Sequence, residues 1–406
     1  MRILYLSSWF PYPPDNGARM RTYNLLRQLA RRHEIALLSF VQGEAPTGAA
    51  LEAVGALCQV LGTLPQRHFQ PSKPRALLRL LSSQPRSALE MYDPRMRECL
   101  DQALRQHDFD LVIGSEIGPG VAVAPYLAKL DHIPCVIEDL EVSMIWNQYR
   151  GQTTWRGKFQ HSLTWWKQKR YTVRLLSRMQ GCTVASETEQ ALLHRLLPDT
   201  LPLAVVPNGV DLASYRTGWR PAAPDTLVFP GALTYQANFD AMVFFLREVW
   251  PLIRAARPGV TLRITGRTDD VPLARLALTE GVILTGYLDD VRPTVAQSRV
   301  CVVPLLTGGG TRLKILEAMA LGTPVVSTTQ GAEGLAVVPG KDVLIADEPA
   351  AFAGAVLRLL ADEALCAQLA ANGRELVEAR YSWEACAAQL ERLLDQVVEQ
   401  GYATGA

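Results

Sequence analysis

The residues best suited to chemistry in this sequence form one short run, GGGTRLKILE, at positions 308–317. Consecutive glycines let a ligand approach the backbone closely, and Thr311 is placed to cap a helix that would start there. Unpaired backbone amides at such a helix start attract phosphate, and Arg312 and Lys314 add two cations. Glu317, one to two turns further on, offers a carboxylate to sugar hydroxyls. The run therefore fits a nucleotide diphosphate, although a glycine-rich turn before a solvated, charged helix would look the same.

The spacing of this run differs from that of the common phosphate-binding loops. It does not follow GxxxxGK(S/T), and the sequence contains no GxGxxG. The P-loop and the usual dinucleotide-binding loop are therefore both disfavoured.

The elements that must position this run alternate along the whole chain. Short runs typical of β-strands are separated by amphipathic helical stretches, which predicts an α/β protein with parallel sheets and helices on both faces. Ligands of such sheets bind at the carboxyl ends of the strands. A helix is expected over 18–32, with its arginines facing outward. Strands of a first sheet are expected at 2–7, 34–40, 108–114, 134–140 and 182–186, and of a second at 226–231, 261–266, 281–286, 299–305, 323–328 and 342–346.

A boundary between two domains is expected near PLAVVPNGVD, at 202–211, where a strand ends in Pro-Asn-Gly. The predicted division is 1–210 and 211–382. From 349 onward only helical patterns remain, and the last helix has an apolar face. That face must pack on something already built.

The composition excludes some classes of function. Lys plus Arg (41) nearly balance Asp plus Glu (40), so the overall charge does not suggest a nucleic-acid-binding protein. The seven cysteines are scattered and lack metal-ligand spacing, which predicts reduced thiols, no metal site and a cytoplasmic location. The N-terminus is interpreted as a first strand rather than a signal peptide, and no apolar stretch reaches the roughly 18–20 residues that span a bilayer.

Two segments combine cations with apolar residues and contain no acid. Between Glu141 and Glu187, eight Lys or Arg residues interleave with aromatic residues over 146–178. The second segment, 67–86, carries basic residues around LLRLL. Such segments suit the anionic inner face of the cytoplasmic membrane, which leads to the hypothesis of peripheral docking there. The alternative is a pair of helices with buried aromatics and a solvated basic face.

The stretch 308–334 resembles family 4 glycosyltransferases. VVPNGVD (205–211), FPGALTYQANFDAM (229–242), TGYLDDVRP (285–293) and YSWE (381–384) occur in the order expected for that family. The second half is most similar to sugar transferases found with bacterial exosortase and exopolysaccharide loci.

This resemblance implies a GT-B fold, in which two Rossmann-like domains face a central cleft and a C-terminal helix, here 383–406, crosses back to the first domain. It also implies metal-independent, cofactor-free transfer from a nucleotide-diphosphate sugar, with retention at the anomeric carbon. The expected acceptor is a glycan or a lipid-linked molecule in exopolysaccharide or envelope glycan biosynthesis.

The resemblance also assigns donor-site residues in the second domain. The paired-glutamate signature of the family places its second carboxylate at Glu317, on the ribose, and its first at Gly309, where none is present. The basic pair that many members carry is also absent, and Arg312 and Lys314 are its expected substitutes. Asn238 and Tyr235 are further candidates, although a helix cap and a loop anchor explain them equally well. The base would be read by backbone groups around 285–288. The predicted donor site is completed in this domain by Gly231, Gly266, Tyr287, Gly308, Gly310 and Thr311, and by Gly17 in the first domain.

In the first domain, Gly17 matches the family's glycine-containing loop between first strand and first helix, and Arg19 and Arg21 could reach an anionic group there. A plain β-to-α turn is the alternative. Asp139 or Glu141 stands where relatives carry a catalytic histidine. Either carboxylate could orient the acceptor hydroxyl or act as a base, although helix starts collect acids in any case.

Two other functions remain open on the sequence. The missing glutamate and basic pair would suit a non-catalytic subunit that binds a nucleotide sugar. The same fold could also carry a nucleotide-sugar epimerase or hydrolase.

Overall fold

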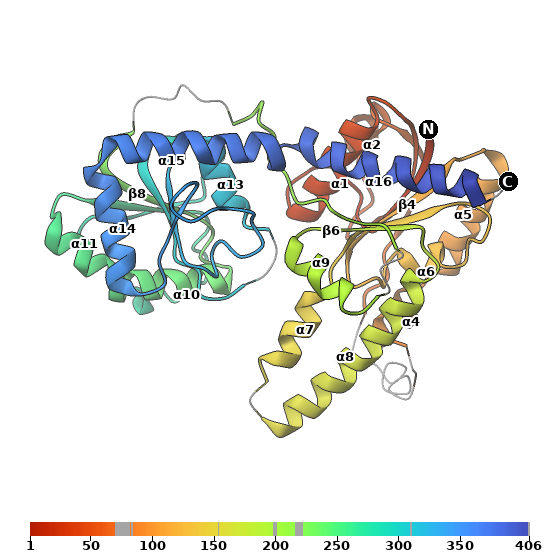
Figure 1. Ribbon diagram of the computed structural model, residues 1–406, viewed down its shortest axis with the longest axis horizontal. Helices are drawn as coiled ribbons and strands as arrows, with labels where there is room; N and C mark the ends of the chain where they lie inside the picture. Colours follow the sequence, from red (N-terminus) through yellow and green to blue (C-terminus); the bar gives the residue numbers. More distant parts are fainter. Residues whose placement is uncertain are drawn as a thin grey trace. The chain divides into compact units, whose positions relative to one another are not determined.

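The computed structural model of the chain contains two compact α/β units (Figure 1). It describes residues 1–69, 82, 84–152, 154–197, 201–215, 222–308 and 311–404. Unit 1 comprises Met1–Asn208 and Cys386–Ala406, and unit 2 comprises Gly209–Ala385. The prediction of an α/β protein with two parallel sheets is confirmed.

Unit 1 is built on a seven-stranded parallel sheet in the order β3-β2-β1-β4-β5-β6-β7. Its first strand lies in the centre, where Leu4 pairs with Ala36 on one side and with Val112 on the other. The strands are β1 (Arg2–Ser7), β2 (Glu34–Val41), β3 (Gln59–Pro65), β4 (Leu111–Gly118), β5 (Cys135–Leu140), β6 (Gly181–Val184) and β7 (Leu203–Val205). The helices are α1 (Gly17–Leu29), α2 (Gly48–Gly55), α4 (Arg86–Met91), α5 (Pro94–Gln106), α6 (Ala124–Leu127), α7 (Ser143–Arg150), α8 (Trp155–Leu176) and α9 (Glu187–His194).

Unit 2 repeats this plan with six parallel strands in the order β10-β9-β8-β11-β12-β13. The strands are β8 (Ala223–Pro230), β9 (Thr261–Thr265), β10 (Val282–Gly286), β11 (Ser298–Val303), β12 (Val325–Ser327) and β13 (Leu344–Ile345). The helices are α10 (Gln236–Phe244), α11 (Trp250–Ala256), α12 (Arg292–Ala296), α13 (Leu313–Ala320), α14 (Pro349–Ala361) and α15 (Glu363–Leu376). Short π-helical turns at Phe245–Val249 and Val377–Tyr381 and a 3₁₀ turn at Leu273–Arg275 complete it.

The last helix, α16 (Trp383–Thr404), starts in unit 2 and belongs to unit 1 from Cys386 onward. Its apolar residues Leu390 and Leu394 are fully buried. Leu393 and Val397 lie so close to Gly181 at the start of β6 that a side chain there would touch both. The sequence predicted an apolar face on the last helix but not what it packs against. In the structure this face covers one end of the sheet of unit 1.

The sequence predicted most strands at the right place, because a strand buried on both faces leaves an unbroken apolar run. It missed the edge strand β3, whose sequence QVLGTLP includes a glycine and a proline. The expectation that helix 18–32 turns its arginines outward is wrong for Arg21, which is only 1% exposed. Along the described part of the chain, none of the helices is long and apolar enough to cross a membrane.

Candidate active site

In unit 2 the strand order reverses between β8 and β11, which are neighbours in the sheet although they are far apart in sequence. Loops that leave two such strands diverge to opposite faces of the sheet, and ligands bind in the resulting crevice. The loop after β8 includes Gly231 and Tyr235 and leads to α10, which carries Asn238 in its first turn. The loop after β11 leads to α13 and includes the glycine-rich run. The topology therefore brings the two main groups of predicted donor residues to one edge of one sheet.

Lys314 in the first turn of α13 joins these two loops. Its Nζ donates a hydrogen bond of 2.6 Å to Oδ1 of Asn238 and lies 4.4 Å from the ring centroid of Phe229 at the end of β8. Burial lowers the pKa of Lys314 to about 8, because the amine loses most of its water. The ammonium group therefore lies in a site with little water, where its electrostatic attraction for an anion is stronger than in bulk solvent.

The loop after β8 is shaped to admit this lysine. Asn238 also donates to the carbonyl of Ala232 at 2.9 Å, so its side chain anchors this loop. A side chain at Gly231 would lie 2.8 Å from Nδ2 of Asn238 and 2.9 Å from Nζ of Lys314. Gly266, with φ +98°, passes so near the same loop that a Cβ would sit 2.6 Å from the nitrogen of Ala232. Both glycines are required by close packing.

Arg312 shapes the glycine-rich loop from within. Its buried guanidinium donates to the carbonyl of Gly308 at 2.8 Å and to that of Gln330 at 3.1 Å, and it lies 3.6 Å from a carboxylate oxygen of Glu333. Gly308 has φ +114°, in the left-handed region that favours glycine. Burial lowers the pKa of Arg312, although Glu333 opposes this. Arg312 therefore fixes the conformation of the loop.

The helix after this loop begins one residue later than the sequence predicts. The helix α13 starts at Leu313, so its N-cap is Arg312 and the predicted cap at Thr311 is wrong. The run GGGTR contains too much glycine to hold a helical turn, and the first stable turn needs the apolar residues Ile315 and Leu316 on the core. Gly309 and Gly310 lie outside the described residues.

Glu317, on the next turn of α13, is held by a residue that sequence reasoning missed. Tyr215 donates from its hydroxyl to Oε1 of Glu317 at 2.9 Å. Burial raises the pKa of Glu317, and the hydrogen bond from Tyr215 and the charge of Lys314 oppose that rise. No local pattern could have linked two residues 102 positions apart.

The two tyrosines predicted for the donor site are exposed. Tyr235 is the N-cap residue of α10, but its hydroxyl does not cap the described residues of that helix, and it lies near Gly308. Tyr287 follows Gly286, which has φ +68° and accepts a hydrogen bond from the backbone of Gly266 at 2.9 Å. Both rings are thus free to stack on a ligand.

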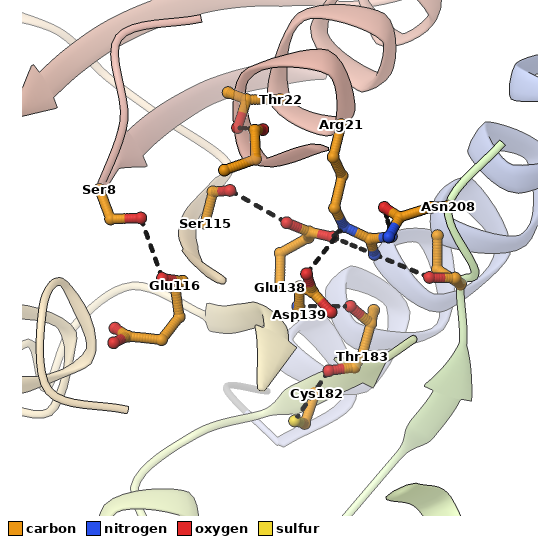
Figure 2. A network of polar contacts seen from close by, with 12 residues as sticks. Ser8, Arg21, Thr22, Ser115, Glu116, Glu138, Asp139, Cys182, Thr183 and Asn208 are labelled. Atoms are coloured by element: carbon orange, nitrogen blue, oxygen red, sulfur yellow. Dashed lines mark hydrogen bonds and ion pairs between the residues drawn. The ribbon is translucent and has the colours of Figure 1, made fainter. Parts of the chain in front are cut away.

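In unit 1 the corresponding strand ends carry a buried polar network (Figure 2). Arg21 on α1 donates from Nε to Oε1 of Glu138 at 2.7 Å, from Nη1 to Oδ1 of Asn208 at 3.0 Å and from Nη2 to the carbonyl of Val206 at 2.7 Å. Ser115 donates to the second oxygen of Glu138 at 3.0 Å. Arg21 was expected to reach an anionic group of a ligand. In the structure it binds the carboxylate of Glu138 instead.

Two carboxylates share this one guanidinium. Oδ2 of Asp139 lies 3.3 Å from Nε of Arg21, and the backbone amide of Asp139 donates to Thr183 at 3.0 Å, with φ +59°. Burial disfavours the charge of Arg21, but Asp139 and Glu138 outweigh it and hold the guanidinium pKa above its usual value. Burial raises the pKa of Glu138, and Arg21 opposes this. Asp139 is therefore engaged in structure, whereas it was predicted as a possible base.

Glu141, the other carboxylate predicted to be catalytic, lies just beyond β5. Burial, with smaller contributions from the charges of Glu189 and Asp139, raises its pKa to about 7. The Glu189 carboxylate accepts from the amides of Val142 and Ser143 and so occupies the start of α7. A half-buried carboxyl that titrates near neutrality suits proton transfer.

The loop after β1 ends at Gly17, the first residue of α1, whose Cα faces open space. Asn16 caps the helix by accepting from the amide of Arg19 at 3.1 Å. The side chain of Arg19 pairs with Asp15 at 3.0 Å and stacks over Trp9. This pairing leaves the interpretation of the loop as a plain β-to-α turn open.

Comparison of the sequence with known families accounts for most of the chain. Residues 15–214 match Glycosyltransferase Family 4, and residues 224–362 match Glycosyl transferases group 1. A phosphatidyl-myo-inositol mannosyltransferase of Mycobacterium leprae is 30% identical over 206 residues, which is 48% of this chain and 54% of that protein. A D-inositol 3-phosphate glycosyltransferase of Rhodococcus erythropolis is 30% identical over 50% of each chain. The chain spans about half the length of the curated relatives it matches.

Solved structures are similar over nearly the whole chain. Sucrose-phosphate synthase from Thermosynechococcus elongatus has a TM-score of 0.69 at 19% identity, covering 98% of this chain and 100% of that one. The Anabaena protein HepE in complex with UDP has a TM-score of 0.67 at 16% identity, with the same coverage. WaaG, a glycosyltransferase involved in lipopolysaccharide biosynthesis, has a TM-score of 0.59 at 14% identity, covering 96% and 99%. These likenesses establish the GT-B fold that the sequence predicted.

Proposed function

Because the chain belongs to the family 4, group 1 glycosyltransferases, we propose that it transfers a sugar from a nucleotide-diphosphate sugar to a glycan or lipid-linked acceptor. The single observation that carries this proposal is Lys314, a partly buried ammonium group at the strand switch point of unit 2. A cation in such a position suits a ligand that brings two phosphates to the edge of a parallel sheet.

We assign the donor to unit 2. Lys314 contacts the diphosphate, and the loop that Arg312 folds presents backbone amides and the start of α13 to the same group. Glu317, oriented by Tyr215, accepts hydrogen bonds from the ribose hydroxyls. The exposed ring of Tyr287, beside the backbone of 285–288, is available to the base. The missing carboxylate at Gly309 leaves the contact with the donor sugar to backbone groups.

We propose that the reaction proceeds with retention and without a metal ion. The bond between the anomeric carbon and the diphosphate oxygen breaks, and a bond to the acceptor oxygen forms on the same face of the sugar. Lys314 stabilises the negative charge that develops on the leaving diphosphate, which is the role a metal ion would otherwise take. We assign the proton of the acceptor hydroxyl to Glu141 of unit 1, because burial raises the pKa of this carboxyl to about 7.

We assign the biological acceptor to exopolysaccharide or envelope glycan biosynthesis. The resemblance to exosortase-associated sugar transferases supports this class, as does the involvement of WaaG in lipopolysaccharide biosynthesis. Such acceptors are assembled at the inner face of the cytoplasmic membrane, where a lipid-linked intermediate would be available to the enzyme.

A panel of nucleotides and nucleotide sugars tests the proposal. Thermal shifts are measured with UDP, GDP and ADP, beginning with UDP because HepE was solved with it. The matching sugar nucleotides are then incubated with the protein, with and without EDTA, and the products are separated. Slow release of free sugar and nucleoside diphosphate in the absence of an acceptor, unaffected by EDTA, supports a metal-independent transferase, whereas fast release would favour a hydrolase. Binding without turnover would instead favour a non-catalytic subunit, and a changed sugar still attached to its nucleotide would favour an epimerase.

A further inference from the structure

The helices α7 and α8 form a hairpin that projects from the sheet of unit 1 (Figure 1). None of the residues of α7, all of which the structure describes, is buried. The same holds for the fully described stretch of α8 from Trp155 to Lys167. Over most of its length the hairpin therefore has no fully buried residue, although Trp146 and Trp165 pack against the core of unit 1.

The inner side of the hairpin accounts for some of its aromatic residues. The rings of Trp146 and Trp165 pack against each other at 4.9 Å between the two helices. Toward the end of α8, Tyr171 donates to the carbonyl of Gly120 at 2.9 Å and Gln168 donates to that of Pro119 at 2.6 Å. These contacts anchor the second half of α8 to unit 1 and define which face of the helix points inward.

The opposite face of α8 carries an apolar stripe. Trp155, Phe159, Leu163 and Trp166 follow one another at intervals of four, four and three residues, which places them on one side of a helix. Trp155 is 75% exposed and Phe159 is 70% exposed. A surface helix normally turns such a stripe toward the core, and here it turns the stripe toward solvent.

Cations surround this stripe. Between Val142 and Ser186 the chain has eight Lys or Arg residues and no Asp or Glu. The guanidinium of Arg156 lies 5.3 Å from the ring centroid of Trp155, and that of Arg170 lies 4.9 Å from the ring centroid of Trp166. The positive charge therefore lies on the same face as the apolar side chains, rather than on the opposite face.

We propose that the outward stripe of α8 is the surface by which unit 1 docks on an anionic lipid membrane. Tryptophan favours the headgroup region, and Lys and Arg can lie along the apolar surface while their charges meet lipid phosphates. A protein partner would need acidic and apolar groups in a matching pattern, whereas an anionic leaflet supplies both over any area. Stable docking needs two signals, and here exposed apolar groups and a basic cluster occur together.

This surface corresponds to the first of the two segments predicted from the sequence. In the second, 67–86, Lys73, Arg75 and Arg79 lie outside the described residues, so the inference rests on α7 and α8 alone. It depends on the proposed function only in that a lipid-linked acceptor would lie in the same membrane. Docking itself needs neither donor nor acceptor.

Vesicle flotation of the full-length chain tests the inference. The vesicles contain either phosphatidylcholine alone or a 3:1 mixture of phosphatidylcholine with phosphatidylglycerol, the ratio being about that of an anionic leaflet. We expect flotation with the anionic vesicles, little with the neutral ones, and loss of binding at about 1 M salt, where charges are screened over about 3 Å. Failure to float with anionic vesicles at low salt would overturn the inference.

Two sets of variants distinguish binding by the stripe of α8 from binding by exposed apolar side chains elsewhere in the chain. Trp155→Ser, Phe159→Ser, Leu163→Ser and Trp166→Ser combined should lower the partition coefficient at least about tenfold. A matched control changes Leu252, Leu278 and Ile283 of unit 2 to Ser; these are exposed about as much as Leu163 and Trp166 and should leave flotation unchanged. Lys158→Glu with Arg170→Glu should weaken binding about fivefold or more for each charge removed.

Two further readouts decide among the alternatives. Equal flotation of the stripe variant and the unchanged chain would overturn the inference. So would a dimer in solution that the stripe variant dissociates, because the surface would then serve a second copy. The thermal shift with UDP is measured on the same variants. Flotation without any nucleotide-induced shift would leave the docking surface standing while the proposed function fails.

Discussion

Nucleotide binding should depend on the protonation of Lys314, and this dependence can be worked out from its environment. Burial holds its pKa at about 8, against an ordinary value of 10.5. The amine is therefore charged below pH 8 and loses its charge as the pH rises through that value. The terminal phosphate of UDP has its second pKa at about 6, so the ligand keeps nearly its full charge from pH 7 to 9. The affinity for UDP should accordingly fall as the pH rises.

The size of the fall follows from the charged fraction. About nine-tenths of Lys314 is protonated at pH 7 and about one-tenth at pH 9, so the dissociation constant should rise about tenfold, or about 1.4 kcal/mol. A charge-assisted hydrogen bond of about 1.5–3 kcal/mol is large enough to support that change. Binding at pH 9 should also draw nearly one proton per UDP from the buffer, because the diphosphate restores the charge of the amine.

Isothermal titration calorimetry at pH 7, 8 and 9, in buffers with different heats of ionisation, measures both quantities. Lys314→Arg keeps its charge and should bind UDP with little dependence on pH. Lys314→Met should bind about tenfold or more weakly at pH 7, and its affinity should likewise change little with pH. A dissociation constant of the unchanged chain that stays constant from pH 7 to 9.5 would refute the assignment, as would the same slope in Lys314→Met.

The remaining predictions concern the other carboxylates and the buried arginine. Glu141→Gln should lower kcat at least about a hundredfold without changing the affinity for UDP, and steady-state rates should lose their increase through pH 7, because the base that must deprotonate near that pH is gone; an unchanged pH profile would argue against Glu141. Glu317→Gln should weaken UDP binding about tenfold and reduce its preference over 2′,3′-dideoxy-UDP, and an undiminished preference would place the ribose elsewhere. Arg21→Met leaves two buried carboxylates without their cation, so the free energy of unfolding of unit 1 should fall by about 3–5 kcal/mol in urea titrations, while UDP binding by unit 2 should persist. Equal stability of that variant would mean that Glu138 is neutral in the folded chain.

The fold followed from the sequence because its strands are contiguous apolar runs and its helices have a regular period, both of which are local properties. The candidate donor loop could be proposed for the same reason, since Arg312, Lys314 and Glu317 lie within six residues. The sequence did not predict which residues contact these side chains. Asn238 and Tyr215 reach Lys314 and Glu317 across the sheet, over separations of 76 and 102 positions. Only the strand order brings them together.

The buried network of unit 1 shows the same limit more strongly. Arg21 is the one fully buried arginine of α1, where Arg19 and Arg27 are partly exposed, and nothing in its neighbourhood in sequence distinguishes it. Its burial depends on Glu138, which is 117 residues away and at the end of another strand. Asp139 was a plausible base because it follows an apolar run, yet the same guanidinium holds it. Ion pairs between residues far apart in sequence therefore determine which carboxylates are engaged in structure and which are not.

The position of α16 has a consequence for the order in which the chain becomes folded during synthesis. Unit 2 lies between the two parts of unit 1, so the ribosome completes unit 2 first. The sheet of unit 1 must wait, with one end uncovered, until Leu390, Leu393 and Val397 have emerged. A nascent or clipped chain that ends near residue 385 would thus carry a finished unit 2 and an unfinished unit 1. Such a chain would be a natural substrate for chaperones and proteases that recognise exposed apolar surface.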